Sequence, residues 1–235
     1  MKTIAIITAR GGSKRIPKKN IKEFCGKPII AYSIEAALQS GVFDEVMVST
    51  DSEEIAAIAK KYGARVPFLR SEKTSNDYAT TADVIEEVLD GYEKVGKTFD
   101  VFCCIYPTAP FVTGEKLKEA TKTLIQSPAE SLTPVVKYGF PPQRALVIRE
   151  GNLQFQYPEF AKARSQDLEP VYHDCGQFYV CKVEAFKKNR SVISSQAIAY
   201  IVPEEEVQDI DTMTDWVLAE VKYKTFIIGK EGEHV

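Results

Sequence analysis

Basic side chains are concentrated in one short segment near the start of the chain. Residues 10–22 hold six of the 30 Lys and Arg in the 235-residue sequence, and no Asp or Glu. Gly11, Gly12 and Ser13 stand in this segment, where small residues let backbone N–H groups turn inward around an anion. The segment predicts a polyphosphate site, with a solvated basic loop as the alternative. The six basic residues are Arg10, Lys14, Arg15, Lys18, Lys19 and Lys22.

The spacing in this segment differs from two common phosphate-binding motifs. Residues 11–14 read Gly-Gly-Ser-Lys, without the G-x-x-x-x-G-K-[ST] spacing of a P-loop. The G-x-G-x-x-G fingerprint of dinucleotide-binding folds does not follow either. The predicted anion site must therefore combine lysines, arginines and loop backbone in another arrangement.

A pair of carboxylates further along the chain predicts a magnesium site. Asp209 and Asp211 stand at positions i and i+2, so in an extended segment their side chains point the same way. Magnesium prefers one or two carboxylates and takes its other oxygens from substrate phosphates and water. The alternative is that Asp211 or Thr212 only caps a helix predicted over 212–223.

A third polar group lies between these two sites in the sequence. Residues 164–167 read Arg-Ser-Gln-Asp, and residues 172–179 read Tyr-His-Asp-Cys-Gly-Gln-Phe-Tyr. Hydrogen-bonding side chains of this kind could recognise a polyhydroxylated ligand. The alternative is a hydrated loop beside a strand edge, and His173 alone is more typical of a structural histidine than of a general base.

Alternating strands and helices must position these groups. Short apolar runs predict strands, and helical periodicity with caps and glycine stops predicts helices. This β-α-β-α order with short connections predicts an α/β fold with a single doubly wound, mostly parallel sheet, whose ligands bind beyond the carboxyl ends of the strands. The predicted strands cover residues 4–9, 46–48, 66–69, 101–106, 132–136, 176–181 and 198–202, and the predicted helices cover 29–40, about 52–62, about 81–92, 115–125, 183–188 and 212–223.

The regular alternation is interrupted over about residues 137–170. Proline and glycine pairs mark turns there, and residues 147–149 and 154–156 flank a predicted hairpin turn. We therefore expect one domain over residues 1–225 that contains this insert, followed by a short tail over 226–235.

Composition and charge exclude several classes of protein. With 44% apolar and 27% charged residues, the chain is not collagen, a coiled coil or disordered throughout. A net charge of -3 gives no global attraction for nucleic acid or an anionic membrane, and no apolar run reaches the roughly 18 residues of a membrane span. The start of the chain has too short an apolar core for a signal peptide. The five cysteines form no C-x-x-C pair and the histidines are only His173 and His234, so we expect no zinc site or disulfide framework and a reducing cytoplasm.

The basic segment resembles a long family signature. Residues 9–20 fit the pattern A-R-x-x-S-K-x-x-P-x-K-N of the acylneuraminate cytidylyltransferases, the CMP-sialic acid synthetases. The resemblance extends to about Tyr223 and implies a nucleotide-diphospho-sugar transferase-like fold in which the insert is a dimerisation segment. The further matching blocks are residues 49–51 (Ser-Thr-Asp), Arg70 with residues 77–81, residues 107–110 (Pro-Thr-Ala-Pro) and residues 209–212.

This resemblance implies a reaction between CTP and a nine-carbon 2-keto sugar acid that gives a CMP-sugar and pyrophosphate. It makes Arg10, Lys14 and Lys19 ligands of the triphosphate, and Asp209 and Asp211 ligands of Mg²⁺. Asn20 would contact the ribose, and Arg70 with the backbone near Ala79 would read cytosine. The implied catalytic residues are Arg10, Lys19 and Asp211, and the implied nucleotide-binding residues are Ala9, Arg10, Gly11, Ser13, Lys14, Lys19, Asn20, Arg70, Asp77, Ala79, Thr80 and Thr81.

Within the family, residues 164–168 and 172–179 most resemble the pseudaminic acid cytidylyltransferases. The sialic acid enzymes typically have Asn-Gly where this chain has Cys175-Gly176, and Gln where it has Tyr106. Arginines suit the sugar carboxylate, and the family's insert crosses a homodimer interface, so those of the insert would serve the neighbouring subunit. The implied sugar-binding residues are Tyr106, Arg144, Arg164, Gln166, Asp167, His173, Asp174 and Gln177.

Two alternatives stay open. One is a cytidylyltransferase for legionaminic, N-acetylneuraminic or 3-deoxy-manno-octulosonic acid, the last disfavoured because those enzymes have a different nucleotide loop. The other is a non-catalytic nucleotide-sugar or RNA-binding module, against which the balanced charge and the retained Asp209 and Asp211 weigh.

Overall fold

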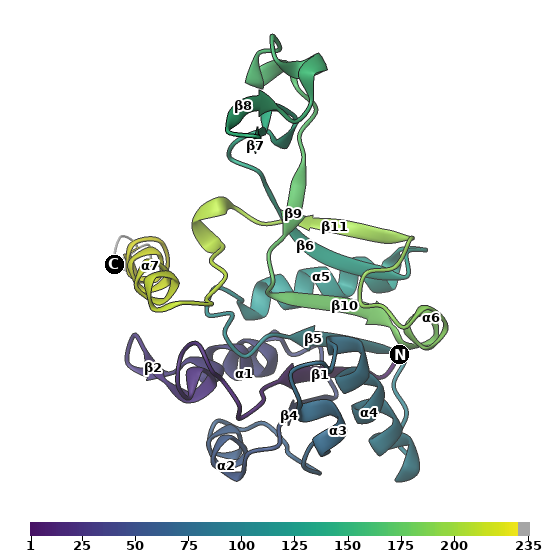
Figure 1. The fold of residues 1–235 in the computed structure, drawn as a ribbon. Helices are drawn as coiled ribbons and strands as arrows, with labels where there is room; N and C mark the ends of the chain where they lie inside the picture. Colours follow the sequence, from purple (N-terminus) through teal and green to yellow (C-terminus); the bar gives the residue numbers. More distant parts are fainter. Residues whose placement is uncertain (230–235) are drawn as a thin grey trace.

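The structure is a computed structural model that describes residues 1–229, and a seven-stranded sheet lies at the centre of this part of the chain (Figure 1). The strand order is β11-β6-β10-β5-β1-β4, with β9 paired to β6. β1, β4, β5, β6 and β11 run in one direction, whereas β9 and β10 run in the other. The predicted α/β fold with a mostly parallel sheet is confirmed.

The elements have the following bounds. The strands of the sheet are β1 (Thr3–Thr8), β4 (Glu45–Ser49), β5 (Val101–Ile105), β6 (Ser131–Lys137), β9 (Tyr172–Asp174), β10 (Phe178–Lys182) and β11 (Ala197–Ile201). Two small hairpins pair β2 (Glu23–Phe24) with β3 (Lys27–Pro28) and β7 (Leu146–Arg149) with β8 (Asn152–Phe155). The helices are α1 (Ile29–Ser40), α2 (Glu53–Lys61), α3 (Glu72–Ser75), α4 (Thr81–Lys94), α5 (Gly114–Gln126), α6 (Val183–Asn189) and α7 (Met213–Tyr223).

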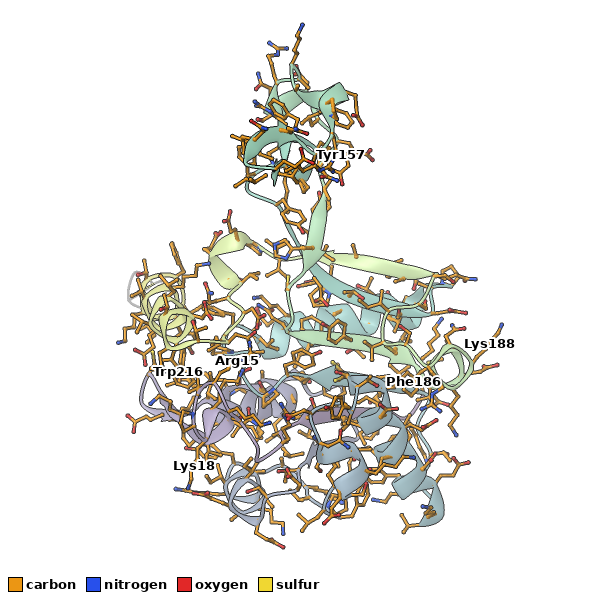
Figure 2. The ribbon with its side chains drawn as sticks, in the orientation of Figure 1. Arg15, Lys18, Tyr157, Phe186, Lys188 and Trp216 are labelled. Atoms are coloured by element: carbon orange, nitrogen blue, oxygen red, sulfur yellow. The ribbon has the colours of Figure 1, made fainter. Side chains whose placement is uncertain are left out.

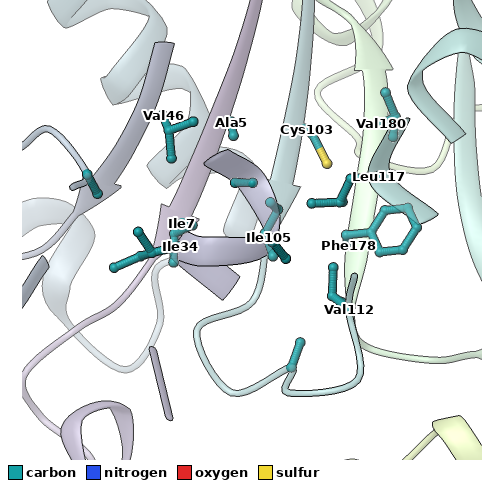
Figure 3. Close-up of a cluster of buried hydrophobic side chains, with 14 of the residues drawn as sticks. Ala5, Ile7, Ile34, Val46, Cys103, Ile105, Val112, Leu117, Phe178 and Val180 are labelled. Carbon is teal, nitrogen blue, oxygen red and sulfur yellow. The ribbon is translucent and has the colours of Figure 1, made fainter. Parts of the chain in front are cut away.

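Alternate side chains of the central strands enter two separate cores. Ala5 and Ile7 of β1 join the cluster that packs against α1 and α5, including Ile34 and Leu117 (Figure 3). Their neighbours Ile4 and Ile6 join a second cluster that packs against α4 and α6. Because successive side chains of a strand point to opposite faces of the sheet, one buried strand packs against helices on both faces. The result is a three-layer architecture.

Helix ends follow the signals in the sequence. Helix α1 ends at Gly41, whose φ of 63° is the left-handed conformation that glycine adopts without strain. Ser52 caps α2, and Thr80 with Asp83 forms a capping box at the start of α4. The cap and glycine-stop signals therefore predict these helix ends correctly.

The strand predicted over residues 66–69 is wrong. Only Arg65 forms a bridge, to Met47, and it exchanges backbone hydrogen bonds of 2.9 Å with Val46 and Val48. Pro67 has no N–H to continue such a ladder. The segment therefore leaves the sheet edge as a loop that leads to Arg70.

The insert is a projection between β6 and β9. These two strands pair through Val136 and His173 at its base, and β7 and β8 form the predicted hairpin within it. Figure 1 shows the insert standing away from the body of the molecule at the top of the view.

No helix in residues 1–229 is long and apolar enough to cross a membrane. A π-helix over Lys224–Ile228 runs across residue 225, so the domain boundary there stays a prediction. The end of the tail, with His234, lies outside the described residues.

Candidate active site

A pocket of about 230 Å³ lies where β1 and β5 end, and four cations line it. The side chains after β1 come from the basic segment, and those after β5 come from the matching Pro-Thr block. Adjacent parallel strands bring these loops together at the carboxyl edge of the sheet, as predicted. The lining residues are Thr8, Arg10, Ser13, Lys14, Arg15, Ile16, Lys19, Asn20, Tyr106, Pro107 and Thr108.

Backbone contacts hold the basic segment against β4. The Ala9 N–H donates to the Ser49 carbonyl at 2.9 Å, and the Gly11 N–H donates to Asp51 Oδ1 at 2.8 Å. A Cβ at Gly11 would lie 3.2 Å from Ser52 Cβ, so this close approach favours glycine. Asn20 donates through Nδ2 to the Arg10 carbonyl at 2.9 Å, which closes the loop on itself. The Asn20 side chain therefore shapes the loop, and its predicted ribose contact stays a prediction.

A buried apolar contact brings the basic segment to the carboxylate pair. Ile16 and Ile210 belong to one core cluster with Trp216, and each is 1% exposed. Because Ile16 lies between Arg15 and Lys19 in the chain, and Ile210 between the two aspartates, burial of the isoleucines aligns their charged neighbours. Figure 2 shows Arg15 on the side of the molecule where Trp216 lies.

Asp211 faces two of the pocket cations. Its Oδ2 accepts from Arg15 at 2.6 Å, and its Oδ1 lies 3.6 Å from Lys19 Nζ. Lys19 Nζ also donates to the Ile210 carbonyl at 2.6 Å. Helix α7 is capped by Thr212, which forms a capping box with Asp215. Of the two cap candidates in the sequence, Thr212 is therefore the cap, and the Asp211 side chain is directed to the site.

The carboxylate pair fits a divalent cation. Burial raises the pKa of Asp209, and the nearby charge of Asp211 raises it further. A bound Mg²⁺ would relieve this repulsion, with its remaining oxygens from phosphates and water. In the part of the chain that the structure describes, no cluster of three or more His, Cys, Asp or Glu could hold a metal. A two-carboxylate site completed by substrate is the arrangement that magnesium accepts.

The residues predicted to read cytosine do not line the pocket. Arg70 is buried and donates to the Ser49 carbonyl at 2.6 Å and to Ser49 Oγ at 3.0 Å. Burial lowers the pKa of Arg70, but guanidinium stays charged in proteins. The Ala79 N–H donates to Asn76 Oδ1 at 3.0 Å, and Thr80 is the helix cap described above. These contacts place Arg70 and Thr80 in the framework of the site, and their contact with cytosine stays a prediction.

Three of the predicted sugar-binding residues lie together beside the pocket. Tyr106 lines it, lies 3.3 Å from Thr81 Oγ1 through its hydroxyl, and packs edge-on against Tyr179. Tyr179 donates to Asp174 Oδ2 at 2.5 Å. Gln177 is 2% exposed, donates through Nε2 to the Glu206 carbonyl at 2.7 Å, and its Oε1 has no hydrogen-bond partner among residues 1–229. Tyr106, Tyr179 and Asp174 thus form a chain of contacts that begins at Thr81, and Gln177 separately contacts the segment that leads to Asp209.

The other predicted sugar-binding residues lie on the projection or at its base. Arg164 pairs with Asp167 at 2.6 Å, and Arg144 donates to Ser165 at 3.3 Å. Gln166 lines a separate pocket that lies between residues 137 and 171. His173 packs against Tyr138 in a tilted arrangement, with 4.7 Å between the ring centroids. The structure therefore does not bring the insert residues to the pocket of their own chain.

Sequence reasoning had not assigned some of the pocket lining to the site. Thr8 lines the pocket although it belongs to a strand, and Arg15, Pro107 and Thr108 line it although the motifs that contain them gave them no individual role. Tyr179, from the third polar group, donates to Asp174. Pro107 and Thr108 stand two and three residues after the end of β5, which is next to β1 in the sheet, so the position after a neighbouring strand was the available signal.

Residues 4–196 match the model of a protein family described as cytidylyltransferase. The chain belongs to the cytidylyltransferase family. It is 42% identical over 225 residues to the pseudaminic acid cytidylyltransferase of Campylobacter jejuni subsp. jejuni serotype O:2, which covers 95% of this chain and 97% of that protein. It is 37% identical to the CMP-N,N'-diacetyllegionaminic acid synthase of Legionella pneumophila, over 94% of this chain and 95% of that protein.

The fold of this cytidylyltransferase has solved counterparts. A structure of CMP:2-keto-3-deoxy-manno-octonic acid synthetase complexed with CTP superposes with a TM-score of 0.68, over 96% of this chain and 98% of the other. Sequence identity in this pair is 18%, so the likeness concerns the fold. It confirms the expected nucleotide-sugar transferase-like architecture.

Proposed function

We propose that this cytidylyltransferase joins CTP to pseudaminic acid and gives CMP-pseudaminic acid and pyrophosphate. The observation that carries the proposal is the pocket at the ends of β1 and β5 that Arg10, Lys14, Arg15 and Lys19 line, with Asp211 facing Arg15 and Lys19. The choice of sugar is supported by the 42% identity with the Campylobacter jejuni protein of that name.

The chain's own residues supply the charge that this reaction needs. The anomeric hydroxyl of the sugar acid attacks the α-phosphorus of CTP and releases its proton to water. The bond between the α-phosphorus and the bridging oxygen breaks, and that oxygen leaves with pyrophosphate. Arg10, Lys14 and Lys19 line the pocket and neutralise charge that develops on the leaving group. Asp209 and Asp211 would hold Mg²⁺, which polarises the α-phosphate when bound. Alignment of the attacking hydroxyl is the remaining task of the sugar-binding residues.

A homodimer would complete the sugar site. Large apolar side chains are exposed on the insert, including Ile148 at 76% and Leu153 at 66%. Such a surface is typical of a subunit interface. Because the insert projects from the body (Figure 1), its arginines would reach the sugar carboxylate in the neighbouring subunit's pocket.

The direct test is a pyrophosphate-release assay with Mg²⁺. Each of CTP, UTP, ATP and GTP is offered with pseudaminic, legionaminic and N-acetylneuraminic acids. We expect turnover with CTP and pseudaminic acid at least about 100-fold above every other nucleotide, because a site that hydrogen-bonds one base leaves its polar groups unpaired with another. Equal turnover with UTP would reject the nucleotide assignment, and preference for legionaminic acid would move the protein to that alternative.

Lys19→Ala should lower kcat/KM for CTP by about 10- to 100-fold. Lys19 is 21% exposed in the pocket, where a positioned cation stabilises transition-state charge by a few kcal/mol. Lys18→Asn is the matched control, because Lys18 does not line this pocket and asparagine tolerates its left-handed φ of 53°. Steady-state kinetics should show the control within about twofold of wild type; equal losses in both variants would contradict a specific role for Lys19.

A heterodimer of two defective subunits should regain activity. In a dimer of Arg164→Ala with Asp211→Asn, one pocket combines an intact carboxylate pair with an intact insert, so about half of wild-type activity is expected. Differently tagged subunits allow its purification and assay. The heterodimer of Lys19→Ala with Asp211→Asn is the control. Both changes lie in the body and Arg164 is intact in both inserts, so each pocket carries a defect and activity should not be regained. An inactive Arg164→Ala and Asp211→Asn heterodimer would show that the insert does not serve the partner's site.

A further inference from the structure

An acidic side chain lies among the cations of the predicted phosphate site, and the reaction above gives it no separate task. Asp77 Oδ1 accepts from Arg10 at 2.7 Å, and Asp77 Oδ2 accepts from Lys14 at 2.5 Å. Both cations line the pocket, whereas Asp77 comes from a loop more than 60 residues further along the chain. Each carboxylate oxygen thus takes one cation, as two phosphate oxygens would.

Asp77 is negatively charged in this position. Hydrogen bonds from Lys14 and Arg10 hold the pKa of Asp77 below its usual value. The carboxylate is therefore ionised at neutral pH, and it forms charge-assisted contacts of the kind that phosphate forms with the same side chains.

The loop around Asp77 holds the carboxylate opposite the cations. Asn76 Oδ1 accepts from the N–H groups of Tyr78 and Ala79 at 2.8 and 3.0 Å, and Arg10 also donates to the Asn76 carbonyl at 3.4 Å. Ser71, at the start of the short helix α3 that leads into this loop, is held by two hydrogen bonds of 2.7 Å to Glu87 on α4. The ion pair thus joins two anchored segments.

The remaining pocket cations are paired in a different way. Arg15 and Lys19 face Asp211, which the proposed function assigns to magnesium, so a bound metal would draw that carboxylate away from them. Arg10 and Lys14 instead face Asp77, which the proposed function does not assign to the metal. A phosphate ligand that binds Arg10 and Lys14 must therefore displace Asp77 or share its cations.

We propose that Asp77 is a positioning residue that acts as an internal competitor: its carboxylate occupies Arg10 and Lys14 when no phosphate is bound, and so weakens the binding of pyrophosphate. The role rests on the proposed function, in which pyrophosphate is the product that must leave this site. Pyrophosphate makes only phosphate contacts, so weakening them limits product inhibition. CTP binding is weakened as well, which raises the KM for CTP but removes no contact made in the transition state.

Calorimetric titration of sodium pyrophosphate, and separately of CTP, tests this role. Asp77→Asn and Asp77→Ala remove the charge at a half-exposed position, with and without a replacing amide. We expect both variants to bind pyrophosphate at least about threefold more tightly than wild type, to show a lower inhibition constant for it, and to have a lower KM for CTP. We expect a change in affinity of only this size because each exposed ion pair contributes a small free energy. Binding to the variants should also weaken more steeply with added salt, because more cation charge is free.

Glu54→Gln is the matched control. Glu54 pairs with Lys18 of the same basic segment at 2.8 Å, and Figure 2 shows Lys18 at a distance from Arg15. This substitution removes the same charge but frees no cation that lines the pocket, so pyrophosphate affinity should stay within about twofold of wild type. If all three variants bind pyrophosphate more tightly, the effect comes from the change in net charge, and the proposed role of Asp77 is overturned. Unchanged or weaker pyrophosphate binding in the Asp77 variants would also overturn it, whereas a wild type that binds neither ligand would overturn the proposed function itself.

Discussion

Asp211→Asn should lower kcat by at least about 100-fold while the melting temperature stays within about 2 °C of wild type. A 100-fold loss corresponds to about 2.7 kcal/mol of transition-state stabilisation. Asparagine retains a similar shape but lacks the negative charge that a magnesium ligand contributes. The ion pairs of Asp211 with Arg15 and Lys19 are partly exposed, and such pairs add little to the free energy of unfolding. Activity and thermal melting are measured on the same preparation over a magnesium titration.

Asp215→Asn is the matched control for this prediction. Asp215 stands four residues further on and accepts from the N–H groups of Asp211 and Thr212, as the partner in the capping box of α7. We expect this variant to melt a few degrees lower and to retain most of its activity and its magnesium response. If Asp211→Asn instead loses stability and responds normally to magnesium, its carboxylate is structural.

The fold was predictable where local signals and burial agree. Strand β1 is a continuous apolar run. Helix α4 begins at a capping box, so its hydrophobic periodicity and its cap both predict the same helix. The failure at residues 66–69 has a local cause that the apolar run concealed, because Pro67 cannot donate to a ladder. The antiparallel direction of β10 depends on where the chain returns after the insert, and no short-range pattern reports it.

The site was predictable to the extent that its residues follow strands. Arg10 and Lys19 were placed because the basic segment begins where β1 ends. The contact of Asp211 with Arg15 depends on two buried isoleucines nearly 200 residues apart, and the pairing of Asp77 with Lys14 depends on the path of a surface loop. Such long-range partners leave no spacing signal in a single sequence.

Pseudaminic acid should exceed N-acetylneuraminic acid in kcat/KM by at least about 100-fold. Pseudaminic acid carries N-acyl groups at C5 and C7, a methyl group at C9 and inverted ring stereochemistry. A site whose buried polar groups match one pattern rejects an analogue that leaves them unpaired. Here the matching groups would be the Tyr106 hydroxyl, the Asp174 carboxylate and the buried Gln177 amide, whose Oε1 has no partner among the described residues.

Tyr106→Gln should narrow this preference at least about tenfold, because it places the side chain typical of the sialic acid enzymes beside the pocket. Tyr106→Phe is the control: it keeps the ring that packs on Tyr179 and removes only the hydroxyl near Thr81. Burial raises the pKa of Tyr106, so the phenol stays protonated and can donate to the sugar at neutral pH. If the apolar ring decides the choice of sugar, Tyr106→Phe keeps the preference; if the hydroxyl decides it, both variants lose it. Steady-state kinetics on both sugars at saturating CTP separates these results, and comparable wild-type efficiency with the two sugars would reject pseudaminic acid as the specific substrate.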